Sequence, residues 1–256
     1  MSVVALAALA VVFLIAPLAG LLGRTSWSHL WGDLSTPVAL DGLRLSLVCS
    51  TWALAVSVAL GVPLAWVLAR VSFPGRHVVR ALATLPMVFP PVVGGVALLL
   101  AFGRDGLLGR PLYEWFGVQF TFSTAGAVLA ETFVAMPFIV VTVEAALRSM
   151  DHRFEEVAAT LGARRGTAFR RVTLPMISPS LLAGGALAWA RALGEFGATI
   201  TFAGNIQGRT QTLPLAIYIS LAGNSRVAVA LSMLLLAVSV VVLVSLRGRF
   251  MSALAR

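Results

Sequence analysis

The sequence predicts an all-α integral membrane protein with about six transmembrane helices. Of its 256 residues, 59% are hydrophobic and only 11% are charged, whereas soluble domains carry about 25% charged residues. The hydrophobic residues fall into blocks near or above the roughly 18–20 residues that a helix needs to cross a bilayer. The blocks leave no room for a folded soluble domain, so we expect one membrane domain over residues 1–256.

The first apolar block is Ser2–Leu22, and we predict an N-terminal helix over residues 1–25. A signal peptide is the alternative, because Ala-rich stretches offer small residues for cleavage. The block lacks a charged n-region and is longer than the apolar part of a signal peptide, which favours a retained helix. A polar, turn-rich segment, Ser26–Asp41, separates it from the second block, Leu43–Ala69.

The third block, Ala81–Phe102, follows a short basic loop, Arg70–Arg80, and carries several helix breakers. Proline removes a helix donor and clashes with the preceding turn. A broken helix is tolerated in a membrane only where protein or a water-filled cavity surrounds it. We therefore expect either structural kinks or a kink that lines a pathway, at Pro86, Pro90, Pro91 and Gly94.

Three further apolar blocks complete the predicted set: Phe122–Leu147, Ser178–Ala203 and Val227–Leu246. The segments between them, Gly103–Thr121, Arg148–Thr173 and Gly204–Arg226, are predicted to be loops, the second beginning with a helix. With the N-terminus inside, twelve arginines fall on the inner side and six on the outer side. Cytoplasmic loops carry the excess of basic residues, so we expect both termini in the cytoplasm. This asymmetry explains the pI of about 11.6 without nucleic acid.

The residue types exclude several kinds of chemistry. All 19 basic residues are Arg, and a phosphate-binding P-loop needs a Lys, so the chain does not hydrolyse ATP by that route. Cys49 is the single cysteine and lies in an apolar run, where it is expected to be a small buried hydrophobe. The three histidines show no zinc-binding spacing, so we expect no metal site.

A helix is predicted at the start of Asp151–Arg171. Asp151 can cap it, and Glu155 and Glu156 lie near the positive end of its dipole. Gly162 is placed to end it in left-handed geometry. An apolar stripe is formed at positions i, i+3, i+4 and i+7 by Phe154, Val157, Ala158 and Leu161. Such a stripe can lie on the membrane surface or dock in the groove of a partner, and the pattern alone leaves both open.

Part of this segment resembles the EAA loop of ABC importer permeases, E-A-A-x-x-x-G-x(9)-I-x-L-P. The matching residues are Glu156-Val157-Ala158, Gly162 and Val172-x-Leu174-Pro175, with Val157 and Val172 as mild departures. In that family the loop is a coupling helix that docks into the ATP-binding subunit. The resemblance implies a cytoplasmic coupling loop over residues 150–173, with coupling roles for Glu156, Val157, Ala158, Gly162 and Pro175.

Further stretches are similar to motifs of molybdate permeases, and sulfate permeases have looser versions of them. They are residues 85–95, 190–199 and 210–218, and the resemblance covers roughly residues 40–250. It implies a type I ABC importer transmembrane domain in a bacterial or archaeal cell membrane. The expected function is import of a tetrahedral oxyanion, molybdate first, with tungstate or sulfate/thiosulfate as alternatives.

The resemblance also implies the partners. They are a second copy of the chain, two ATP-binding cassette subunits and an extracytoplasmic oxyanion-binding protein. ATP and Mg²⁺ would be bound by the cassette subunits, so we expect no cofactor in this chain and no enzyme activity of its own. An intramembrane enzyme or a structural scaffold is the alternative of another class. The one carboxylate pair for such an enzyme is Glu131 with Glu195, and the coupling motif disfavours both alternatives.

Charged residues inside membrane spans are functional candidates by default. Arg191 and Glu195 are four residues apart, on one predicted helix ridge with Leu187 and Thr199, and can pair. The pair, with Thr199 beside it, either fixes helix packing or acts at the gate or anion path. The neighbouring ridge of Ala186, Ala190, Gly194 and Ala198 consists of small residues, which predicts close packing of a buried fifth helix.

Two other acidic residues occupy predicted helices. Glu131 has no obvious local partner in the sequence, so it either binds a neighbouring helix or faces a water-filled cavity. Glu144 and Arg148 are four apart near the inner end of the fourth helix, in the favourable order. We expect them to form a solvated pair at the membrane interface.

Overall fold

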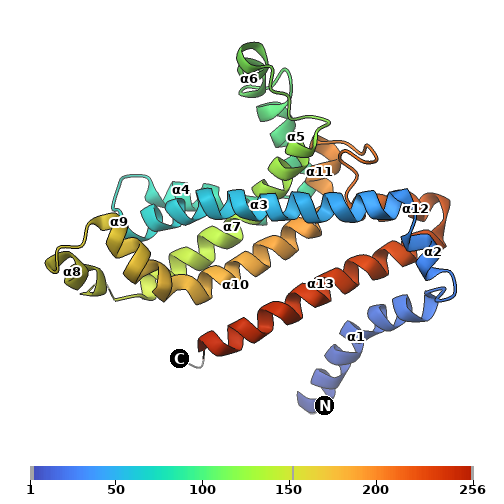
Figure 1. Cartoon of the computed structure of the whole chain (residues 1–256), viewed down its shortest axis with the longest axis horizontal. Helices are drawn as coiled ribbons and strands as arrows, with labels where there is room; N and C mark the ends of the chain where they lie inside the picture. The colour runs from blue at the N-terminus through green and yellow to red at the C-terminus, as the bar shows by residue number, and fades with distance from the viewer. Residues whose placement is uncertain (1–2, 152, 255–256) are drawn as a thin grey trace.

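The computed structural model describes residues 3–151 and 153–254, and all regular elements in this range are helical (Figure 1). In order they are α1 (Val3–Arg24), α2 (Leu30–Leu34), α3 (Pro37–Arg70), α4 (Arg76–Thr84), the 3-10 turn η1 (Leu85–Met87), α5 (Pro91–Phe102), α6 (Gly109–Phe116), α7 (Thr124–Ser149), α8 (Arg153–Thr160), α9 (Arg165–Ala168), the π-helical turn η2 (Phe169–Thr173), α10 (Leu174–Leu193), α11 (Gly197–Phe202), α12 (Leu213–Gly223) and α13 (Ser225–Leu254).

Five helical segments in the described range are long and apolar enough to cross a membrane. They are Val3–Arg24, Pro37–Arg70, Thr124–Ser149, Arg165–Leu193 and Ser225–Val242. The segments Arg76–Met87 and Pro91–Phe102 pass the same test together but meet at an angle of 118°, and they make a sixth span if they are counted as one. These spans confirm the prediction of about six membrane helices and of a broken third block.

The main core forms where α3, α7 and α10 pack side by side along the length of the molecule (Figure 1). Small residues allow the close approach, as expected for helices packed in lipid. Gly61 of α3 lies against Ile139, and Gly184 of α10 lies against Thr142. The α8–α9 segment lies at one end of this bundle and α12 at the other, whereas α5 and α6 project away from it (Figure 1).

The small-residue ridge of the fifth block is not the one predicted. α10 buries Gly184, Ala188 and Ala192, whereas Ala190 and Gly194 are exposed. Residue spacing shows which side chains share a face of a helix, but not which face packs against other helices. In α10 small residues occur on both the buried and the exposed face. The predicted burial is therefore correct for Ala198, which is 0% exposed, but wrong for the ridge as a whole.

The fifth block is also not one continuous helix. α10 ends at Leu193, Gly194 to Phe196 are not helical, and α11 begins at Gly197. A new helix can start here because the side chain of Glu195 accepts a hydrogen bond from the backbone N–H of Ala198, at 2.8 Å. At its other end this helical segment begins earlier than predicted, at Arg165, and runs through η2 into α10.

Several predicted loops contain short helices. α4 occupies part of Arg70–Arg80, α6 lies inside Gly103–Thr121 and α12 lies inside Gly204–Arg226, while α2 and the first turn of α3 fall inside Ser26–Asp41. These helices have at most 11 residues. Isolated helices of that length are marginal in water. Packing against the long helices stabilises α2, α4 and α12, whereas α6 packs mainly against α5.

The two broken spans meet at their breaks. A side chain on Gly197, the first residue of α11, would lie 2.7 Å from Cβ of Pro91, the first residue of α5. One turn further along, Gly95 of α5 faces the backbone of Ala198. Glycine is required at these positions because each helix approaches the backbone of the other.

Replacing Gly95 by Ala should lower the stability of the folded protein by about 1–3 kcal/mol, as overpacking of a tight contact does. The added Cβ would lie 2.6 Å from Cβ of Thr201 and 2.9 Å from the carbonyl oxygen of Ala198. Thermal unfolding of the purified protein in detergent measures the effect. Gly20→Ala in α1 is the matched control, because its Cβ would meet nothing within 4 Å. Equal midpoints for Gly95→Ala and the unchanged protein would contradict the α5–α11 contact.

Candidate functional site

The segment predicted to be a coupling helix is α8, and both of its ends are built as the sequence indicates. Oδ1 of Asp151 accepts a hydrogen bond from the N–H of Arg153 at 3.0 Å. Gly162 has a φ of +82°, and the N–H groups of Gly162 and Ala163 donate to the carbonyl oxygens of Ala159 and Ala158. This pair of bonds is a Schellman cap, so the helix has a fixed start and a fixed end.

The apolar stripe of α8 faces solvent. Phe154, Val157 and Leu161 are 52%, 56% and 83% exposed, and with Ala158 and Val172 they line an open groove. Glu156 beside the stripe is exposed, and so is Pro175 at the start of α10. Large apolar groups in a fixed helix with no cover from their own chain are typical of an interaction surface.

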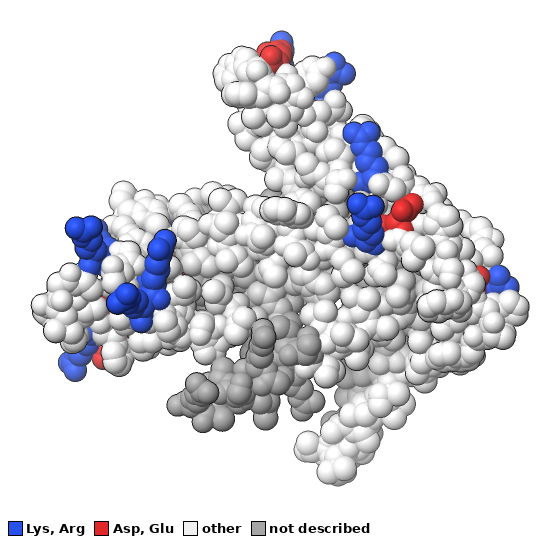
Figure 2. All heavy atoms as spheres, viewed as in Figure 1, with Lys and Arg blue, Asp and Glu red and all other residues white. Residues whose placement is uncertain are grey.

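Basic side chains surround this surface. Figure 2 shows several blue groups over the end of the molecule that carries α8 and α9, and further blue and red groups right of the centre, at the top and at the right edge. Arg164, Arg165, Arg170 and Arg171 belong to this end of the chain and are all exposed or half-buried. Arginines concentrated in one segment between two spans are the pattern that cytoplasmic loops show.

Glu155 differs from its neighbour Glu156 because it points back to the membrane helices. Its Oε2 lies 3.5 Å from Nε of Arg70, the last residue of α3. Its Oε1 accepts a hydrogen bond from the hydroxyl of Thr173 at 2.7 Å. The sequence pattern assigned Glu155 only to the helix dipole, because neither partner is close to it along the chain.

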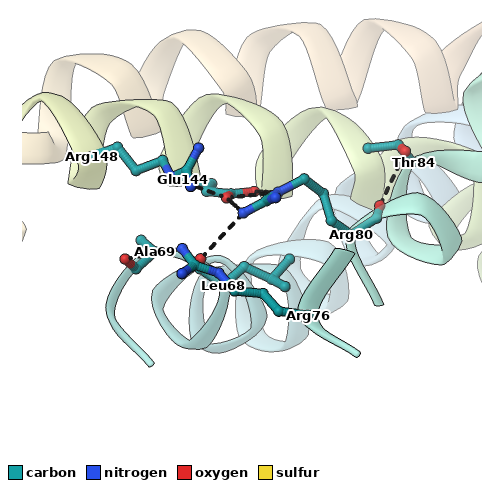
Figure 3. A network of polar contacts seen from close by, with 7 residues as sticks. All are labelled: Leu68, Ala69, Arg76, Arg80, Thr84, Glu144 and Arg148. Carbon is teal, nitrogen blue, oxygen red and sulfur yellow. Dashed lines mark hydrogen bonds and ion pairs between the residues drawn. The ribbon is translucent and has the colours of Figure 1, made fainter. Parts of the chain in front are cut away.

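A second ionic network lies at the same edge of the bundle (Figure 3). Glu144 of α7 accepts hydrogen bonds from Arg80 of α4, at 3.0 Å and 3.2 Å from Nε and 2.6 Å from Nη2, and its Oε1 lies 3.5 Å from Nε of Arg148. Nη2 of Arg80 also reaches the carbonyl oxygen of Leu68 at 3.5 Å. Arg76 likewise donates to the carbonyl of Ala69, so α4 supplies positive charge to the carboxyl end of α3.

This network corrects the predicted Glu144–Arg148 pair. The side chain of Glu144 is only 8% exposed, so it is not solvated, and its principal partner is Arg80 rather than Arg148. The sequence could not show this because Arg80 is 64 residues away. A bidentate guanidinium–carboxylate contact is a strong, oriented interaction, and here it holds α4 against α7.

The predicted pair of Arg191 and Glu195 forms inside the membrane region, although not on one helix ridge. Nη1 of Arg191 contacts Oε2 of Glu195 across the break between α10 and α11. Glu195 is 1% exposed, whereas the Arg191 side chain is 31% exposed. Because Glu195 also accepts the N–H of Ala198, one carboxylate neutralises an arginine and caps a helix.

The other predicted members of this region occupy different environments. Leu187, placed on the same ridge, is 54% exposed. Thr199 is fully buried in α11, and its hydroxyl has no hydrogen-bond partner among the described residues. Glu131 of α7 is 1% exposed, and its Oε2 also has no such partner there. Burial of Glu131 excludes open solvent around it in this conformation.

The predicted helix breakers lie at the bend of the third block. Pro86 is inside η1, Pro90 precedes α5 with a ψ of 130°, and Pro91 is the first residue of α5. Gly94 is buried, and a side chain there would lie 3.2 Å from the ring of Phe133. The break at Pro90–Pro91 therefore faces the break at Glu195–Phe196 through the contact of Pro91 with Gly197.

An ion pair at the end of the bundle that carries α2 and α12 was not predicted from the sequence (Figure 1). Arg226, at the start of α13, lies 3.1 Å from Asp33 of α2 through both Nε and Nη2. The two residues are 193 positions apart, and no local pattern signals their contact. The pair fixes α2 to the first turn of α13.

The Arg191–Glu195 pair leads to an asymmetric prediction. Arg191→Met should cost about 3–5 kcal/mol, because it leaves a buried carboxylate unpaired. Glu195→Gln should cost less, because glutamine retains an acceptor for Ala198 and Arg191 is partly exposed. The double variant should recover part of the loss.

The measurement is the yield and the thermal midpoint of the folded protein in detergent, with Arg209→Met, an exposed arginine, as the control. Single variants that fold normally yet abolish transport would show instead that the pair acts in the anion path.

Comparison with known proteins places these features in a family. A family model described as "binding-protein-dependent transport system inner membrane component" matches residues 61–256. The molybdenum transport system permease protein ModB of Mycobacterium tuberculosis is 49% identical over 241 residues, which cover 93% of this chain and 90% of that protein. The sulfate transport system permease protein CysT of Salmonella typhimurium is 36% identical over 244 residues, which cover 93% and 88%.

A solved structure has the same fold. It is a bacterial ABC transporter that imports the acidic polysaccharide alginate, with a TM-score of 0.77 and 18% identity over 94% of this chain and 90% of that one. The extent of the sequence match shows the family, and the solved structure shows the same fold. This chain belongs to the family of inner membrane components of binding-protein-dependent transport systems.

Proposed function

We propose that this chain is the membrane-spanning subunit of an importer for molybdate, driven by ATP that is bound with Mg²⁺ and hydrolysed on a separate subunit. The exposed apolar stripe on the capped helix α8 is the observation that carries the coupling part of the proposal. The 49% identity to a molybdenum permease over most of both chains supports the substrate. The chain lacks the P-loop lysine, which fits an ATPase on another chain.

The orientation rests on the distribution of arginine along the chain. We place α8 and α9 in the cytoplasm together with both termini, because twelve arginines fall on that side and six on the other. The opposite end, with α2 and α12, then faces the extracytoplasmic binding protein. A second copy of the chain and two ATPase subunits complete the proposed assembly.

The proposed mechanism divides the work between two regions. At the cytoplasmic end, the ATPase binds the apolar stripe of α8 and displaces this helix as nucleotide binds and is hydrolysed. In the membrane, the paired breaks of α4–α5 and α10–α11 allow the spans to change angle without unfolding a helix. We assign the Arg191–Glu195 pair to holding this region together, because Glu195 is buried and caps α11.

Sulfate is the second candidate substrate, since the chain is 36% identical to a sulfate permease. Molybdate, tungstate and sulfate are alike as tetrahedral dianions, and the outer binding protein is expected to do most of the selecting. We expect molybdate with its binding protein to stimulate ATP hydrolysis by the reconstituted complex. If sulfate and not molybdate stimulated ATP hydrolysis, sulfate would be the substrate, and the chain would still be assigned as the membrane subunit of an importer.

Glu156→Lys and Gly162→Val should each weaken association with the ATPase or abolish stimulated hydrolysis. Lysine at Glu156 would repel a basic partner surface, and valine at Gly162 would disfavour the left-handed cap by about 1 kcal/mol or more. Both proteins should still insert, because neither change lies in a membrane span. The measurement is co-purification of the ATPase, followed by hydrolysis with and without anion.

Two matched controls are available in α6, which projects from the bundle away from the α8 end (Figure 1). Glu114→Lys changes an exposed acid of α6, and Gly117→Val changes a glycine with a φ of +67° that ends α6. Both controls should leave association and hydrolysis unchanged. Unchanged association and hydrolysis in Glu156→Lys and Gly162→Val as well would remove the support for coupling through α8.

A further inference from the structure

The contact between α8 and the membrane helices is sparse. A cavity of about 650 Å³ separates the end of α3 from the loop that carries α8 and α9. Its walls are mostly apolar and include Trp66 and Val67 of α3, and Ala163 and Phe169 of the loop. If side chains filled this space, displacement of the loop would be passed to α3 through close packing. With the cavity between them, displacement has to pass through individual contacts at its walls.

Glu155 makes such contacts in the wall of this cavity. Its two carboxylate oxygens are shared between Arg70 on one side and Thr173 on the other. The Arg70 side chain is 5% exposed and the whole residue Thr173 is 1% exposed. One side chain of α8 is thus tied to the last residue of α3 and to the residue that precedes α10.

The backbone at Thr173 is also unusual. Phe169–Thr173 forms a π-helical turn between α9 and α10. Such turns interrupt the regular ladder of a helix and occur often at functional sites. The carboxylate of Glu155 therefore holds the helix at the point where its winding changes.

We propose that Glu155 is a positioning residue that transmits displacement of α8 to α3 and α10, through Arg70 and Thr173. The proposal rests on the ATP-driven coupling proposed above and adds the route inside this chain. It separates two roles in one helix. The exposed stripe and Glu156 are assigned to the ATPase, whereas Glu155 is assigned to the membrane domain, where it contacts Arg70 and Thr173.

The test removes the charge of Glu155 and measures binding of the ATPase separately from stimulated ATP hydrolysis. In Glu155→Gln the ATPase should still co-purify, while hydrolysis stimulated by the molybdate-loaded binding protein should fall by about fivefold or more, the lower end of coupling between sites. Thr173→Val, which removes one of the two contacts, should reduce it less. Glu114→Gln in α6, another acid paired with an arginine, is the matched control and should behave as the unchanged protein.

A cross-linking measurement follows the motion itself and needs no anion. Val67→Cys and Ala163→Cys lie on opposite walls of the cavity, and a bifunctional maleimide can join them in a Cys49→Ser background. Without further changes the cross-linking rate should depend on whether ATP is bound to the complex. Glu155→Gln should remove that dependence. A charge swap, Arg70→Glu with Glu155→Arg, should restore part of it, although the bond to Thr173 stays lost.

The outcomes for Glu155→Gln distinguish a role in transmission from a role in docking or folding. Normal stimulation and ATP-dependent cross-linking in Glu155→Gln would overturn it. Loss of ATPase association or of folded protein in Glu155→Gln, without recovery in the charge swap, would also overturn it, because Glu155 would then serve docking or folding. A complex that molybdate does not stimulate would refute the proposed substrate, and the cross-linking would still report on the link.

Discussion

A charge or an unpaired backbone N–H inside a membrane must find its partner within the protein, and Glu195 meets both needs with one carboxylate. It binds the guanidinium of Arg191 and accepts the N–H of Ala198. Where the helix breaks between α10 and α11, Glu195 therefore provides a partner for one free N–H and for one charge. In the bent pair α4–α5, the helix α5 begins against this point, because Pro91 packs against Gly197. The shape of the membrane region depends on this arrangement.

Two further arginine–carboxylate pairs lie at the two ends of the bundle, and each of them joins helices that are distant in sequence. Arg226 binds Asp33 at the end near α12, and Arg80 binds Glu144 at the end near the last turn of α3 (Figure 3). Pairs at a surface contribute little when they are fully solvated, but Asp33 and Glu144 are 9% and 8% exposed. The chain contains no lysine, and the planar guanidinium suits oriented bidentate contacts better than an ammonium group.

The sequence predicted what depends on local pattern. The apolar blocks, the break at Pro90–Pro91 and both ends of α8 were read from spacing and residue type, and the structure contains them. It did not predict the break after Leu193, because the cap there is a buried glutamate whose role depends on folding back onto its own chain. It also did not distinguish Glu155 from Glu156. They are neighbours in sequence, and only the positions of Arg70 and Thr173 show that one faces inward.

The central claim is that the stripe of α8 meets an ATPase and not the lipid surface. Leu161 is 83% exposed, so a cysteine at this position, in a Cys49→Ser background, reports directly on what covers the stripe. We predict rapid labelling by a water-soluble maleimide in liposomes that contain the permease alone, and strong protection once the ATPase subunit is added. Protection in liposomes without the ATPase, with no change when it is added, would place the stripe on the membrane and contradict the account.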